Sequence, residues 1–97
     1  MRRNITQPDS FLVALGEIVH DLRVNSGLSQ QELADLVGVH RTYVSDIERG
    51  ARNLTVTTVV RMANSLEVEP SRLFRLVDDR IDANDPDVAP AHLRIEK

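Results

Sequence analysis

Two short helical patterns joined by a glycine leave the middle of this chain few ways to fold. Ser29 and Glu32 have the spacing of a capping box, which begins a helix, and Gly38 can end that helix in a left-handed conformation. In the pattern that follows, Val44 and Ile47 face one way, whereas polar side chains fill the remaining circumference. Two helices joined by a tight turn that contains glycine predict a helix-turn-helix, whose second helix exposes its outer face.

Three more helices are predicted around this unit. Leucine, isoleucine and valine at helical spacing predict a helix over residues 10–25, with Asp9 or Ser10 as its cap. Thr55 can cap a fourth helix, and Pro70 suits the first position of a fifth. In the second and fourth helices, the apolar residues expected to face the core are Leu33, Leu36, Val37, Val56, Val59, Val60, Ala63 and Leu66.

The chain is therefore expected to be all-α, with one compact five-helix domain over residues 10–77 after a polar lead of residues 1–9. Aromatic residues make up only 3% of the chain, which suits helix packing better than a β-sandwich or barrel. Residues 78–97 combine two prolines with many acids, so they are predicted to form a flexible acidic tail. The sequence has no cysteine, so disulfides and thiolate metal sites are excluded.

The net charge of −3 does not argue against a nucleic-acid partner, because the charge is unevenly distributed. Residues 1–77 contain nine basic and nine acidic residues, whereas residues 78–97 contain three basic and six acidic ones. DNA affinity depends on local neutralisation of phosphates rather than on the total charge. No apolar run approaches the roughly 20 residues that span a bilayer, and no secretion signal is recognisable, so a cytoplasmic location is expected.

The central segment resembles a known family of regulators. Between Arg23 and Phe74 the chain carries S-Q-x-E-L-A, a glycine turn and x-Y-V-S-x-I-E-R-G, and it resembles the lambda-repressor-like (Cro/repressor, XRE) helix-turn-helix family. Within that family, RTYVSDIERGARNLT looks most like the controller proteins of restriction–modification systems. The resemblance implies a transcriptional regulator that binds a palindromic operator as a homodimer, with a recognition helix at about 40–49 in the major groove.

The same resemblance assigns roles to individual residues. The residues expected to contact DNA bases are Arg41, Thr42, Ser45 and Asp46. The residues expected to contact the DNA backbone are Gln30, Tyr43, Arg49, Arg52 and Asn53. Each could instead be an ordinary solvated polar residue, and Tyr43 could serve mainly in packing. Arg23 and Glu48 match a family pair that forms a partly buried salt bridge and orients the recognition helix.

The apolar residues of the fifth helix exceed what one side of a short terminal helix can bury. Some complete the core, and the remainder would form an exposed patch of the kind that marks an interface. The predicted dimer interface therefore consists of Leu73, Phe74, Leu76 and Val77. The expected partners are double-stranded DNA and a second copy of the chain, with RNA polymerase or another protein as a further possibility and no membrane.

Two other function classes, an enzyme and a protein-binding regulator, fit parts of the sequence. Ser45, Asp46 and His40 superficially suggest a catalytic triad, but they lie within two turns of one exposed helix with no pocket, so an enzyme is not expected. His20 and His40 lack further ligands at metal spacing, so neither a metal nor a cofactor is expected. The alternative is an antitoxin or phage-switch regulator whose acidic tail binds a protein partner.

Overall fold

Five α-helices and their connections make up the part of the chain that the computed structural model describes, residues 6–84. No strand occurs within these residues, so the predicted all-α class and the five-helix architecture are confirmed. The helices are α1 (Pro8–Asn25), α2 (Gln30–Val37), α3 (Arg41–Glu48), α4 (Val56–Ser65) and α5 (Pro70–Asn84).

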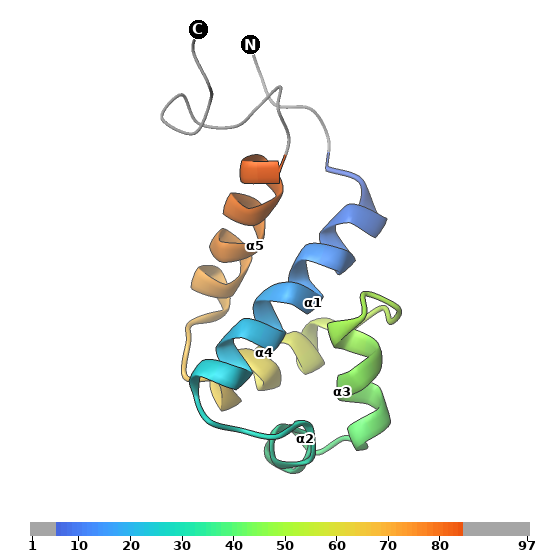
Figure 1. Ribbon diagram of the computed structural model, residues 1–97, viewed down its shortest axis with the longest axis vertical. Coiled ribbons are helices and arrows are strands. Elements are labelled where there is room, and N and C mark those ends of the chain that lie inside the picture. The colour runs from blue at the N-terminus through green and yellow to red at the C-terminus, as the bar shows by residue number, and fades with distance from the viewer. Residues whose placement is uncertain (1–5, 85–97) are drawn as a thin grey trace, which may run out of the picture.

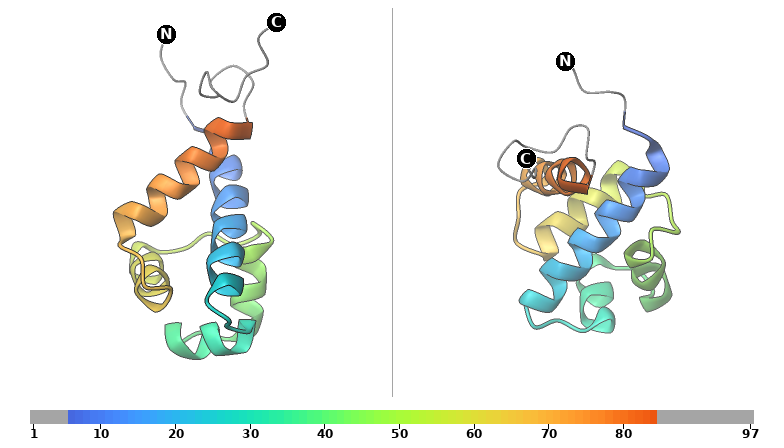
Figure 2. Two further views of the ribbon diagram at one scale, coloured as in Figure 1. Left: turned by 60° about the vertical axis from the view of Figure 1, so that its left-hand side comes forward. Right: turned by 45° about the horizontal axis from the view of Figure 1, so that its top comes forward.

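The two longest helices, α1 and α5, pack against each other, and the start of α1 lies at the same end of the molecule as the end of α5 (Figure 1). α2 and α3 pack together at the opposite end, and α3 also packs against α1. Both additional views place α3 on the opposite side of the bundle from α5, with α1 between them (Figure 2). This arrangement leaves one side of α3 facing solvent.

The helix-turn-helix forms through the local signals that the sequence carries. The Ser29 hydroxyl accepts from the backbone N–H of Glu32 at 3.0 Å, and the Glu32 carboxylate accepts from the N–H of Ser29 at 2.8 Å, which completes the capping box. Gly38 ends α2 with φ of 89°, in the left-handed region that glycine adopts without strain. Two residues later His40 starts α3 without a capping bond from its side chain.

The core lies where all five helices converge. Its fully buried side chains include Val19 of α1, Leu33 of α2, Val44 and Ile47 of α3, Met62 of α4, and Leu73 and Val77 of α5. At about 25 cal/mol for each Å² of apolar surface removed from water, such side chains stabilise the fold by roughly 1.5–3 kcal/mol each. Because the buried residues of α3 are Val44 and Ile47, which share one side of the helix, the core holds α3 through that face.

Three predicted core residues proved to be exposed, namely Leu36, Val56 and Val60. Successive helical residues are about 100° apart, and α2 faces the core through Leu33, Ala34 and Val37, so Leu36 lies outside that face. In α4, Met62 is buried instead, which turns Val60 toward solvent and leaves Val56 in the open first turn.

Both ends of the predicted domain also differ from expectation. α1 begins at Pro8 rather than at residue 10, and its N-cap is Gln7, so neither Asp9 nor Ser10 caps the helix. α5 continues through residues 78–84, which the sequence placed in a flexible tail. Within that extension Ile81 packs on the core, and Arg80 donates to Glu17 and Asp21 of α1, each at 2.8 Å. These contacts with α1 explain why the acidic segment continues as helix; the rest of the predicted tail, residues 85–97, lies outside the described residues.

Candidate nucleic-acid interface

The outer face of α3 carries the polar residues that the sequence predicted as base contacts. Arg41 and Thr42 are exposed in the first turn, while Ser45 and Asp46 are partly exposed one turn later. Residues on the opposite face, such as Val44, are fully buried. One face of a two-turn helix therefore anchors it, and the other presents hydrogen-bonding groups to solvent.

A glycine in α1 sets how closely α3 approaches the body of the protein. Gly16 is buried in the middle of α1, opposite the last turn of α3. A Cβ atom at this position would overlap the backbone carbonyl oxygen of Ile47 and lie 2.7 Å from that of Glu48. Only glycine allows this separation between the two backbones. Gly16 was not among the predicted residues, although a glycine inside an apolar helical pattern is a signal of close packing.

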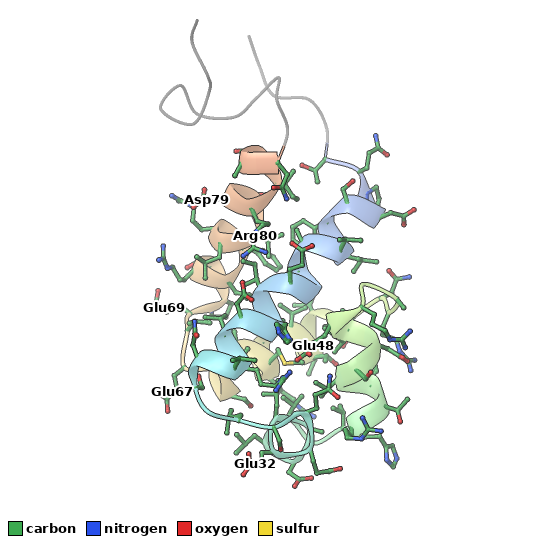
Figure 3. The ribbon with its side chains drawn as sticks, in the orientation of Figure 1. Glu32, Glu48, Glu67, Glu69, Asp79 and Arg80 are labelled. Atoms are coloured by element: carbon green, nitrogen blue, oxygen red, sulfur yellow. The ribbon has the colours of Figure 1, made fainter. Side chains whose placement is uncertain are left out.

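The predicted ion pair between Arg23 and Glu48 is present and joins α1 to the C-terminal end of α3. Arg23 Nε donates to Glu48 Oε2 at 2.6 Å, and Arg23 Nη2 donates to Glu48 Oε1 at 3.1 Å. The side chains are only 12% and 7% exposed, respectively. Glu48 lies between α1 and α3 in Figure 3. The pair is bidentate and shielded from water, so it fixes the orientation of α3 better than a surface pair would.

The surroundings of Glu48 shift its pKa through opposing effects. Burial raises the pKa of the carboxyl, but hydrogen bonds from Arg23, Gln30 and His20, together with the charge of Arg23, outweigh burial and hold the pKa below its ordinary value. The hydrogen bond to Glu48 likewise raises the pKa of Arg23. Both groups are therefore charged at neutral pH, and the ion pair persists.

Gln30, predicted as a phosphate contact, connects the buried ion pair with the outer face of α3. Its Nε2 donates to Glu48 Oε1 at 3.0 Å, and its Oε1 accepts from Arg41 Nη1 at 3.3 Å. Both ends of the amide are thus engaged within the protein. A chain of polar contacts runs from Arg23 through Glu48 and Gln30 to Arg41, and it helps to orient the guanidinium of Arg41.

A second polar group, which we call the Asp46 cluster, consists of Asp46, Arg49, Arg52 and Tyr43. Asp46 Oδ1 accepts from Arg49 Nη2, and Asp46 Oδ2 accepts from Arg52 Nη2 at 3.2 Å. The guanidinium of Arg52 lies over the ring of Tyr43, 4.6 Å from its centroid. Asn53 is exposed in the loop after α3. The structure therefore brings two of the predicted backbone contacts, Arg49 and Arg52, to one carboxylate, and a third, Tyr43, packs against Arg52.

The predicted dimer residues divide into two groups. Leu73 and Val77 are completely buried in the core of a single chain, so their assignment to an interface was wrong. They lie four residues apart on the face of α5 that packs against the other helices. Leu76 is partly buried against the core, whereas Phe74 is 46% exposed and makes an edge-to-face contact with Phe11 of α1. Only Phe74 presents a large apolar surface to solvent at these four positions.

The structure of residues 6–84 also bears on three other features: a metal site, a catalytic triad and a membrane-spanning helix. No cluster of three or more histidine, aspartate or glutamate side chains in this range could hold a metal ion. His20 Nδ1 lies 3.2 Å from Glu48 Oε1 and 3.3 Å from Arg23 Nη2, so this histidine is part of the ion-pair network between α1 and α3. Asp46, the acid of the hypothetical triad, is bound to two arginines rather than to a histidine. None of the described helices is long and apolar enough to cross a membrane.

Comparisons with known proteins agree with this geometry. Residues 19–73 match the family model HTH_3, described as helix-turn-helix. Control protein C.BamHI of Bacillus amyloliquefaciens is 41% identical over 67 residues, which cover 68% of this chain and 83% of that protein. The crystal structure of the restriction–modification controller protein C.AhdI of Aeromonas hydrophila is 42% identical, with a TM-score of 0.62 over 64% of this chain and 94% of that one.

A third relative was solved with nucleic acid. The controller protein C.Esp1396I, described as a tetramer in complex with its natural 35 base-pair operator, is 31% identical to this chain, with a TM-score of 0.67. The match covers 73% of this chain and 93% of that one.

Proposed function

This chain belongs to the helix-turn-helix family HTH_3 and is related to restriction–modification controller proteins, and from that premise we propose that it is a sequence-specific transcriptional regulator that binds a palindromic operator as a homodimer. The observation that carries the proposal is the two-sided character of α3, with Val44 and Ile47 buried and Arg41 and Thr42 exposed. The protein acts by binding rather than by catalysis.

In the proposed complex the outer face of α3 enters the major groove. Arg41 can donate two hydrogen bonds to guanine, and Thr42 and Ser45 can hydrogen-bond to base edges or contact a thymine methyl group. Arg49, Arg52 and Asn53 are at the end of α3 and in the next loop, and in this complex they would contact phosphates. Gln30 acts on DNA mainly through Arg41, because its amide is already engaged at both ends.

A homodimer would give the protein two recognition helices related by two-fold symmetry. Helix-turn-helix dimers place these helices about 34 Å apart, one turn of B-DNA. We assign the contact between copies to the surface around Phe74 of α5 and Phe11 of α1, whose rings are in edge-to-face contact. α5 lies on the other side of the bundle from α3 (Figure 2). The operator complex of C.Esp1396I supports both an oligomer and a DNA ligand for this chain. A function in restriction–modification control is the specific form of the proposal, and an RNA polymerase partner stays a prediction.

Two alanine variants separate base recognition from phosphate contact. Arg41→Ala is expected to reduce discrimination at one or two base positions by about 1–3 kcal/mol each, because the bidentate contact to guanine is lost. Arg52→Ala should weaken binding to the selected duplex without changing the base preferred at the positions that Arg41 reads, and it should lower the salt dependence by roughly one phosphate contact. Competition titrations with single-base variants of a selected duplex, repeated at several salt concentrations, measure both effects.

Arg72→Ala is the matched control, since it removes the same charge from an exposed position on α5. This variant should bind like the parent. If Arg41→Ala also discriminates between duplexes as the parent does, α3 does not read bases through its first turn, and the proposed contacts are wrong.

A further inference from the structure

Asp46 occupies a position that a favourable DNA contact alone does not explain. It lies in the last turn of α3, where the negative end of the helix dipole disfavours a carboxylate. The other acid of α3, Glu48, points toward α1. Asp46 is therefore the one negatively charged side chain on the outer side of α3. A negative charge on a surface that approaches phosphates weakens binding to every duplex unless it has a specific use.

The contacts of Asp46 show what the carboxylate does in the free protein. Each of its two oxygens accepts a hydrogen bond from a different arginine, Arg49 and Arg52. The Asp46 side chain is 20% exposed, whereas the two arginine side chains are 64% and 46% exposed. The guanidinium groups are thus drawn toward a less exposed acid, and both belong to residues proposed to contact phosphates.

Resting on the proposed DNA-binding function, we propose that Asp46 is a specificity-determining residue that acts as an internal competitor of DNA phosphate. In the free protein its carboxylate occupies the donors of Arg49 and Arg52. On a matching sequence an amino group at the base edge, as in cytosine, donates to Asp46 and releases the arginines to the phosphates. On other sequences no such donor is available, so Asp46 either retains the arginines or remains unpaired next to the DNA.

This exchange makes nonspecific binding weaker without weakening the specific complex to the same extent. Exposed ion pairs are weak individually, so the arginines can leave Asp46 when a better partner is present. A carboxylate left without a donor in the interface is unfavourable, which is how a repulsive group excludes wrong partners. Specificity then comes partly from what Asp46 prevents on other sequences.

The test compares the parent with Asp46→Asn, which keeps the shape of the side chain and removes its charge. Binding to a random-sequence duplex pool and to a duplex selected by the parent is measured over a range of salt concentrations. For the pool, the variant is expected to bind about three to ten times more tightly at low salt, the range expected when one or two exposed ion pairs stop competing with phosphates. Its salt dependence should also steepen by about one phosphate contact.

The ratio of the two affinities decides the outcome. The proposal predicts that the preference of Asp46→Asn for the selected duplex falls, because pool binding improves more than specific binding. Equal gains on both duplexes would overturn it, since the carboxylate would then act only through net charge, and so would an unchanged affinity for the pool. A parent protein that binds no duplex would overturn the proposed function as well, whereas a selective parent with an indistinguishable variant would overturn only the role of Asp46.

Discussion

Replacing Glu48 by alanine is expected to lower the free energy of unfolding by about 3–5 kcal/mol, because the change leaves Arg23 charged and shielded from water without its carboxylate partner. The remaining partners of Arg23 are the backbone carbonyl of Leu28, 2.8 Å from Nη1, and His20 Nδ1, 3.3 Å from Nη2. Domains of this size are stable by only about 5–15 kcal/mol, so the variant should be close to unfolding at physiological temperature. Chemical denaturation followed by circular dichroism measures the loss.

A double variant distinguishes loss of the ion pair from loss of packing. Removing both charges in an Arg23→Leu, Glu48→Leu protein should recover part of the stability, because no charge is then left buried. The single variants Arg23→Leu and Glu48→Leu complete the comparison. If their effects simply add in the double variant, Arg23 and Glu48 do not act as a pair.

The dependence of the free energy of unfolding on pH, on its acid side, gives a second test of Glu48. Its folded-state pKa lies below the unfolded value, so the unfolded chain binds the proton more readily and acid favours unfolding. The stabilisation is complete above the unfolded pKa of about 4.3 and is lost as the pH falls through the lower folded value. Glu48→Gln should lose this part of the pH dependence. If the stability of that variant falls with acid just as that of the parent does, other carboxyl groups dominate the pH dependence.

Gly16→Ala is expected to destabilise the protein by about 2–3 kcal/mol, in the upper part of the range for overpacked cores. The added Cβ meets two backbone carbonyl groups of α3, which cannot rotate away as a flexible side chain could. The helices must therefore separate, and α3 must shift relative to the core. Thermal and chemical unfolding measure the loss of stability, and duplex titration of the folded variant reports the displacement of α3.

The sign of the effect makes this prediction decisive. At a helix position with free space, alanine stabilises relative to glycine by up to about 1 kcal/mol, so a more stable Gly16→Ala protein would show that α1 and α3 are not in such close contact. Gly27→Ala is the matched control, because the added Cβ there meets nothing within 4 Å and only its φ of 74° opposes the change. It should leave duplex binding unchanged.

Several helix boundaries could be predicted because the residues that set them lie close together in the sequence. The Ser29–Glu32 capping box, Gly38 and the Thr55 cap each act within a few residues, and each lies where the sequence placed it. The Arg23–Glu48 pair came from the family resemblance rather than from spacing, since its members are 25 residues apart in the chain. The polar outer face of α3 followed from helical periodicity alone.

The features that were missed depend on contacts between distant segments. Leu73 and Val77 appeared surplus to a short helix, but the bundle buries both. The acidic residues after Val77 suggested a tail, yet Arg80 bonds to two acids of α1 and the helix continues. Gln30 appeared to be a simple phosphate contact. Its bonds to Glu48 and Arg41 join α2 to both ends of α3, and no local sequence pattern encodes them.

Selection of bound duplexes from a random-sequence pool, carried out in parallel with the parent protein and Arg41→Ala, tests most directly whether the exposed side of α3 recognises bases. The parent should recover a two-fold symmetric sequence with half-sites about one helical turn apart, and Arg41→Ala should lose the preference at one or two equivalent positions in each half. If the parent recovers no common sequence, or if both proteins recover the same sequence with equal preference, α3 is not the element that recognises DNA.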